Sequence, residues 1–185
     1  GQIYQPDTDR TAFLYSMVFC RSCGQEFHPV WAHLTNKIPA RLEPREFSDE
    51  SSLKDKEVIN GYFMPDAEQI YSIDDVEKAN FPDGWLEPDK DGELVLRRNY
   101  RPYAPVPTRF RTDGGASPDG LPGWFLQGSF RFCPTCGVEH NVRSSEFRKL
   151  CGLNSEGRSS ATTTLSLSVS VSYTHLRAHE TRMVI

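Results

Sequence analysis

Two short cysteine motifs constrain this chain more than any other feature of its sequence. Both have the form Cys-x-x-Cys-Gly, at residues 20–24 and 133–137. In such a knuckle a tight turn brings both thiolates toward one point, and the glycine adopts a backbone angle that a Cβ would penalise. Two knuckles supply the four soft ligands that a tetrahedral structural zinc needs. The predicted ligands are Cys20, Cys23, Cys133 and Cys136.

The cysteines have two other interpretations. Free or redox-active thiols would fit one isolated pair, but two pairs that are each followed by glycine favour structural metal. A rubredoxin-type iron site uses similar knuckles, so the ligands alone leave iron open. Zinc is favoured because no compact, aromatic-rich frame surrounds the pairs. The fifth cysteine, Cys151, is expected to be a small buried apolar residue rather than a ligand.

The separation of the two motifs indicates a long insertion. The 109 residues at 24–132 lie between the paired cysteines, whereas zinc ribbons usually separate them by roughly 15–20. One site with an insertion is preferred to two sites, because a single knuckle cannot complete a shell of four ligands. Closure entropy grows only with the logarithm of loop length, so such an insertion is tolerable.

Charge divides the chain into an acidic middle and a mildly basic frame. Residues 43–93 hold 16 Asp and Glu against 5 Lys and Arg, a balance of −11, and the remainder has a balance of +7. We interpret the acidic run as a solvated face, because it lacks the Asp-x-Asp-x-Asp-Gly pattern of a calcium loop. The basic frame is compatible with contact to a phosphate backbone.

Residue patterns predict a β-rich α+β fold. It would combine a four-Cys zinc-ribbon-like unit with a long inserted acidic subdomain and a short C-terminal helical segment. Strands are expected at 12–19, 26–32, 94–100 and 124–132, with Pro29 marking an edge strand and residues 114–123 forming a loop. Helices are expected after Ser72 and at 145–150. His28 and His33 are expected to be structural residues, since the cysteines already complete a ligand set.

The expected organisation has five parts. Residues 1–40 would hold the entry strand and first knuckle, 41–123 the acidic and loop-rich insertion, and 124–143 the second knuckle. Residues 144–170 would be helical. Residues 171–181 match one translated frame of a transposase-type sequencing adapter, so we expect 171–185 to be an artefactual tail and the native chain to be cut short near Ser170.

A polar turn in the C-terminal part suits phosphate. Residues 155–163 read SEGRSSATT, where a guanidinium stands beside hydroxyls at a helix start. The alternative, in which the hydroxyls only cap the helix, stays open. The candidate nucleic-acid contacts are Arg158, Ser159, Ser160 and Thr162.

The chain resembles an internal piece of a large bacterial DEAD/DEAH-box helicase of superfamily 2, the zinc-binding insertion between its two RecA-like domains. The resemblance rests on residues 1–4 (GQIY), 19–30 (FCRSCGQEFHPV), 129–138 (SFRFCPTCGV) and 155–166 (SEGRSSATTTLS). It covers most of residues 1–170 and is loose across the acidic middle.

The resemblance implies a structural Zn²⁺ module of an ATP-dependent helicase in the cytoplasm. Its partners would be the RecA-like motor domains in cis and nucleic acid, DNA rather than RNA, with no membrane. ATP and Mg²⁺ would be bound by motor domains outside this chain, because neither a Walker motif nor a DEAH-type box occurs in it. The alternative is a non-enzymatic zinc-ribbon module that binds nucleic acid or protein.

Overall fold

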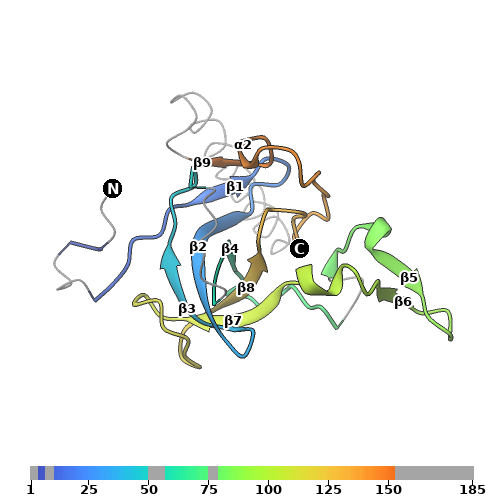
Figure 1. Ribbon diagram of the computed structural model, residues 1–185, viewed down its shortest axis with the longest axis horizontal. Helices are drawn as coiled ribbons and strands as arrows, with labels where there is room; N and C mark the ends of the chain where they lie inside the picture. The colour runs from blue at the N-terminus through green and yellow to red at the C-terminus, as the bar shows by residue number, and fades with distance from the viewer. Residues whose placement is uncertain (1–3, 7–10, 50–56, 75–78, 153–185) are drawn as a thin grey trace, which may run out of the picture.

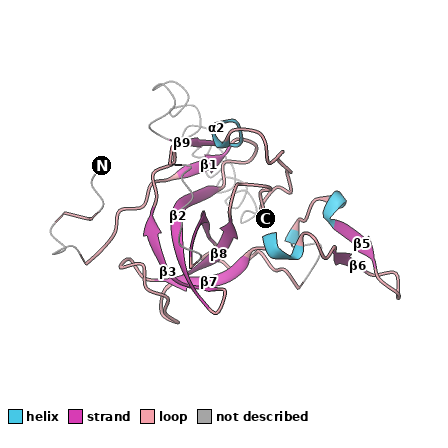
Figure 2. Cartoon of the chain, in the orientation of Figure 1, coloured by secondary structure: helices cyan, strands magenta, loops and turns pink. Residues whose placement is uncertain are grey.

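The computed structural model describes residues 4–6, 11–49, 57–74 and 79–152, and this part of the chain is rich in strands with few helices (Figures 1 and 2). The elements follow in chain order. They are β1 (Val18–Cys20), β2 (Glu26–Thr35), β3 (Ile38–Pro44), β4 (Val58–Pro65), the 3-10 turn η1 (Asp83–Trp85), β5 (Leu86–Pro88), β6 (Leu94–Leu96), the 3-10 turn η2 (Arg101–Tyr103), β7 (Val106–Phe110), β8 (Leu121–Gln127), α2 (Glu146–Lys149) and β9 (Leu150–Gly152).

One antiparallel sheet organises the molecule, in the order β7-β8-β4-β2-β1-β9, with β3 also paired to β2. The sheet curls so that β3 meets the connection between β7 and β8. Leu42 N–H donates to Gly114 O at 2.8 Å, and Ala116 N–H donates to Ala40 O at 3.0 Å. A Cβ on Gly114 would lie 2.2 Å from Leu42 O, so only glycine permits this approach.

Apolar side chains fill the space inside the curled sheet. Since strand residues alternate between two faces, every second position of β2 is free to point inward. The buried cluster consists of Val30, Ala32, Leu42, Phe63, Phe110 and Phe125.

A second, larger core lies outside this one and includes the metal-site region. Phe27 and Phe130 pack edge to face at 4.9 Å, and Tyr62 contacts the same Phe130 ring. Cys20 and Cys133 belong to this second core. The fold therefore places the two knuckles on its outer hydrophobic layer.

The β5–β6 hairpin extends away from the sheet as a separate arm (Figure 1). Trp85, 1% exposed, attaches the base of the arm, because its ring stacks on Tyr100 and packs against Phe132. Its Nε1–H donates to Glu139 Oε1 at 2.9 Å. The arm is thereby fixed to the segment that carries the second knuckle.

The expectation that β2 is an edge strand is wrong. β2 pairs with β4 on one side and with β1 and β3 on the other. Pro29 is tolerated because it lies in the gap where β1 pairing has ended and β3 pairing has not begun. In a strand the nitrogen and the carbonyl of one residue point to the same side, and the Pro29 carbonyl accepts from Arg45 N–H. The proline nitrogen, which carries no hydrogen, therefore faces this gap. A local gap in the ladder thus substitutes for a free edge.

Other boundaries also differ from the sequence-based expectations. The expected strand at 12–19 is formed only at β1, and that at 94–100 only at β6. The strand expected at 124–132 is β8, which starts at Leu121 and ends before Gly128, whose φ is +76°. The helix expected at 145–150 is the single turn α2, and Cys151 lies in β9 rather than in a helix.

The separate acidic insertion expected at 41–123 is not confirmed. β4 and β7 come from this stretch, and both are strands of the main sheet. Residues 81–104, with the β5–β6 hairpin, stand outside that sheet. The helix expected after Ser72 and the five-part division fall partly on residues outside the described ranges.

Candidate metal centre

The first knuckle is the turn of the β1–β2 hairpin. Cys20 N–H donates to Gln25 O at 2.9 Å, and Gly24 N–H donates back to Cys20 O at 2.8 Å. Gly24 has a φ of +78°, the left-handed conformation predicted from the motif. The turn leaves Cys20 buried and Cys23 exposed.

The second knuckle repeats this geometry. Cys133 N–H donates to Val138 O at 3.0 Å, and Gly137 N–H donates to Cys133 O at 2.8 Å, with Gly137 at a φ of +71°. Phe132 and Glu139 form a bridge that closes the short hairpin. Again the first cysteine is buried and the second, Cys136, is exposed. Identical hydrogen bonds therefore present two pairs of thiols in the same way.

The four sulfurs predicted as ligands lie together. All of them are within 4.8 Å of one another; Cys23 Sγ is 3.6 Å from Cys133 Sγ, and Cys20 Sγ is 4.0 Å from Cys136 Sγ. A tetrahedral site with Zn–S bonds of about 2.3 Å requires sulfurs about 3.8 Å apart. The donor set and its spacing therefore fit a zinc ion, and the prediction that the two distant pairs meet in one cluster is confirmed.

The four thiols influence one another's pKa because they lie so close together. Hydrogen bonds from Cys133 and then Cys23 hold the pKa of Cys20 far below its usual value, while the hydrogen bond to Cys20 raises that of Cys133. The hydrogen bond with Cys133 lowers the pKa of Cys23. The hydrogen bond to Cys20 and burial together have the larger effect and raise the pKa of Cys23 to about 12. A divalent cation would let all four sulfurs be thiolates.

Side chains other than the four cysteines brace the two knuckles. Thr135 Oγ1 donates to Gln25 Oε1 at 2.8 Å, a direct bond from the second knuckle to the first. Asn80 Nδ2 donates to Pro134 O at 2.8 Å and to Thr135 O at 3.2 Å. His140 also lowers the pKa of Cys20 through a hydrogen bond. Such outer contacts fix the orientation of metal ligands.

Sequence reasoning missed these bracing residues. Thr135 stands inside the second motif, so its position was available as a signal. Asn80 was not identifiable, because it lies 54 residues from Pro134 and only the fold brings them together.

The histidines and the fifth cysteine are outside the cluster, in agreement with the sequence-based expectation. His28 is held by Ser16 O and Glu26, and His33 Nε2 lies 3.3 Å from Glu43. Cys151 Sγ contacts Phe19 O at 3.5 Å and is half-buried rather than fully buried. The expected nucleic-acid contacts, Arg158, Ser159, Ser160 and Thr162, lie outside the described residues, as does the tail at 171–185.

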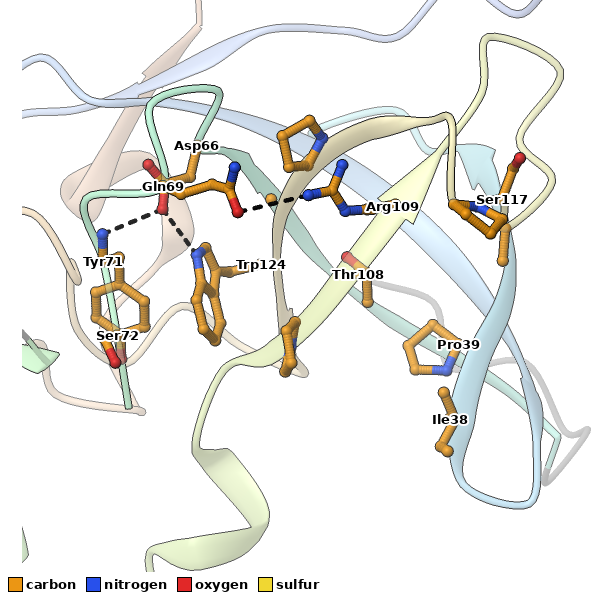
Figure 3. A pocket seen from close by; sticks show the side chains of 15 residues that line it. Ile38, Pro39, Asp66, Gln69, Tyr71, Ser72, Thr108, Arg109, Ser117 and Trp124 are labelled. Atoms are coloured by element: carbon orange, nitrogen blue, oxygen red, sulfur yellow. Dashed lines mark hydrogen bonds between the residues drawn. The ribbon is translucent and has the colours of Figure 1, made fainter. Parts of the chain in front are cut away.

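A separate pocket of about 690 Å³ lies beside β7 and β8 (Figure 3). Its carboxylate, Asp66, accepts from Trp124 Nε1 at 3.0 Å and from two backbone N–H groups, and Arg109 donates weakly to Gln69 Oε1 at 3.4 Å. The hydroxyl of the buried Tyr71 has no partner within the described residues. Asp66 therefore holds the turn at residues 66–71 against Trp124 of β8.

Comparison of the chain with models of protein families, with curated proteins and with solved structures found no match. Within the described residues, no helix has the length and apolar character needed to cross a membrane. The four-cysteine cluster is therefore the observation on which function can be argued.

Proposed function

We propose that the chain is a structural zinc module in which one Zn²⁺, bound by four thiolates, joins the β1–β2 hairpin to the hairpin around Cys133. The observation that carries this proposal is the convergence of two knuckles with the same hydrogen-bond pattern on one cluster of sulfurs. Cys20 and Cys133 are buried in the outer hydrophobic core, so a metal bound there would lie against that core. Zinc would therefore stabilise the fold rather than perform chemistry.

Metal substitution tests this function directly. The refolded chain should bind one metal ion per molecule, and Co²⁺ in its place should give the intense visible absorption of a tetrahedral site with four thiolates. Cys133→Ser should weaken binding strongly, whereas Cys151→Ser, the matched control outside the cluster, should not. Equal metal binding by wild type and Cys133→Ser would contradict the proposal, and iron in the purified protein would change the identity of the metal only.

We further propose that this module is an accessory part of an ATP-dependent helicase. Support comes from the sequence resemblance at residues 19–30 and 129–138. In this proposal the RecA-like domains bind ATP and Mg²⁺ and move along DNA in the cytoplasm, and the module shapes the DNA path or recruits partners.

Three arginines outside the acidic middle already have partners inside the protein. Arg131 lies over the Tyr103 ring at 3.6 Å, whereas Arg109 contacts Gln69 and Arg111 pairs with Asp113. A nucleic-acid contact is therefore proposed for Arg158. In the intact parent, Arg158→Ala should weaken DNA binding at low salt and reduce the salt slope by about one phosphate. If wild type and Arg158→Ala give identical binding curves, the hydroxyls of the turn at 155–163 would serve only to cap a helix. That result would favour the alternative, a non-enzymatic zinc-ribbon module.

A further inference from the structure

Three exposed arginines gather in the segment that joins the β5–β6 arm to β7 (Figure 1). Residues 97–103 read RRNYRPY, and the three arginines are Arg97, Arg98 and Arg101. Arg101 N–H donates to Arg97 O at 3.2 Å, and the 3-10 turn η2 follows directly. A bond of this spacing spans one helical turn, so Arg97 and Arg101 are neighbours. Seven residues thus carry three positive charges and no negative one.

Backbone carbonyls of the arm orient two of the guanidinium groups. Arg97 Nε–H donates to Leu86 O at 2.9 Å, and Arg101 Nε–H donates more weakly to Leu96 O at 3.3 Å. Each bond occupies one of the five N–H donors of its guanidinium. Glu87 Oε2 lies 4.0 Å from Arg97 Nε, and because these side chains are 51% and 46% exposed, water screens the pair. The arginines are therefore oriented and still reach solvent.

The turn that carries these charges is attached to the buried core. Trp85, at the base of the arm, stacks on Tyr100 with ring centres 4.7 Å apart and planes 11° apart. Arg131, which precedes the second knuckle, lies over the Tyr103 ring at 3.6 Å from its centre. Like charges one helical turn apart repel each other, so the arginines stay together at a cost that this packing has to offset. Cations that are held in place before binding suit a polyanion.

Charge is distributed unevenly along the arm. At its tip, residues 89–93 (DKDGE) carry three acids and one lysine, a balance of −2. Asp89 Oδ1 closes this turn by accepting from the N–H groups of Asp91 and Glu93 at 2.8 and 3.0 Å. The base of the arm is positive and the tip is negative. A polyanion would therefore cross the base beside η2 rather than run along the hairpin.

We propose that Arg97, Arg98 and Arg101 form a contact surface for the phosphate backbone of a single DNA strand. Oriented guanidinium groups bind phosphate oxygens through paired hydrogen bonds, and such contacts position a nucleic acid without reading its sequence. DNA is favoured over an acidic peptide because its charge repeats at every nucleotide, so each arginine of a short segment can meet a phosphate. This inference rests on the proposed place of the module beside DNA and is independent of its zinc.

DNA binding by the zinc-loaded full chain tests this surface through its salt dependence. Fluorescence anisotropy of a labelled single-stranded oligothymidylate gives the Kd at a series of sodium chloride concentrations. Each phosphate contact with a single strand contributes about 0.7 to the slope of log Kd against log salt. Replacing Arg97, Arg98 and Arg101 together by alanine should therefore lower that slope by about 2. If this triple variant does not fold, Arg98→Ala alone should lower the slope by about 0.7.

A charge-matched control separates this surface from the net charge of the chain. Lys37, Arg143 and Arg148 are exposed and lie in the β2–β3 turn and at α2, outside the arm. Replacing these three by alanine removes the same charge and should leave the slope close to that of the wild type. Equal slopes for the two triple variants would overturn the proposal, as would a wild-type chain that does not bind the oligonucleotide at low salt.

Competition identifies the kind of polyanion. Polyglutamate at the same concentration of charge should not displace the oligonucleotide, and efficient displacement would overturn the assignment to DNA in favour of an acidic protein. The Co²⁺ absorption of each variant should match that of the wild type, because the arginines are not among the four sulfur ligands. A wild-type chain with this absorption but no DNA binding would reject the surface, while the zinc function and the Arg158→Ala comparison in the parent would stand.

Discussion

Gly24 and Gly84 face equally open space, yet only one has a strained backbone. No atom of the described residues lies within 4 Å of a Cβ built on either glycine, whereas φ is +78° at Gly24 and is not positive at Gly84. Gly24→Ala should therefore lower the free energy of unfolding of the zinc-loaded protein by about 1–2 kcal/mol, the cost of a left-handed residue with a Cβ. Gly84→Ala is the matched control, and denaturant unfolding measures both. Equal effects would show that the backbone angle at the knuckle is not what selects glycine.

The Glu146–Lys149 pair is the second feature that acts at the level of single residues. Glu146→Gln should destabilise the fold by about 3 kcal/mol, because Lys149 would remain buried without its carboxylate partner. Glu87→Gln breaks an exposed pair with Arg97, whose atoms are 4.0 Å apart, and should cost about 0.5 kcal/mol or less. Urea unfolding compares the two, and a neutral Glu146→Gln would mean that the buried pair is replaceable.

Trp85 determines how one element, the β5–β6 arm, is attached to the second knuckle. Trp85→Ala should lower stability by about 3–5 kcal/mol, because it removes a fully buried ring stacked on Tyr100. Trp85→Phe retains an aromatic ring but loses the bond to Glu139, so its cost should be nearer to 1 kcal/mol. Urea unfolding distinguishes packing from hydrogen bonding here. If both variants lose a similar amount of stability, the hydrogen bond to Glu139 rather than ring packing would be what attaches the arm.

Elements with a local signal were predictable from the sequence, and those set by distant contacts were not. The four ligands and the positive φ of Gly24 and Gly137 follow from a five-residue motif that fixes its own turn. By contrast, β4 contains Gly61, which a strand normally disfavours. It is required here because a Cβ would lie 2.4 Å from Leu126 O of β8. The edge-strand prediction from Pro29 was wrong for the same reason, because the gap that accommodates this proline is formed by β1 and β3, which the sequence around Pro29 does not specify.

At the scale of the whole molecule, the metal site and the curled sheet are separate sources of stability. Cys20 and Cys133 pack in the outer core, and the inner cluster around Val30 and Phe125 contains no cysteine. Chelation should therefore remove hydrogen-exchange protection from the amides of Cys20, Gly24, Cys133 and Gly137, while those of β2 and β8 inside the sheet retain theirs. Exchange measured with and without chelator checks this. Uniform loss across both cores would mean that metal and sheet fold as one cooperative unit.

The pairing of β1 with β9 also determines how the molecule would respond to mechanical load. Val18 lies opposite Gly152 and Cys20 opposite Leu150, so both segments leave the pair at the same end. A pull between them would act across the strands and open the ladder one hydrogen-bonded pair after another, beginning at Val18 and Gly152. Three residue pairs offer little resistance to such unzipping. The opening then reaches Cys20, where a metal bound by the four cysteines would tie this strand to the second knuckle and stop the ladder from opening further.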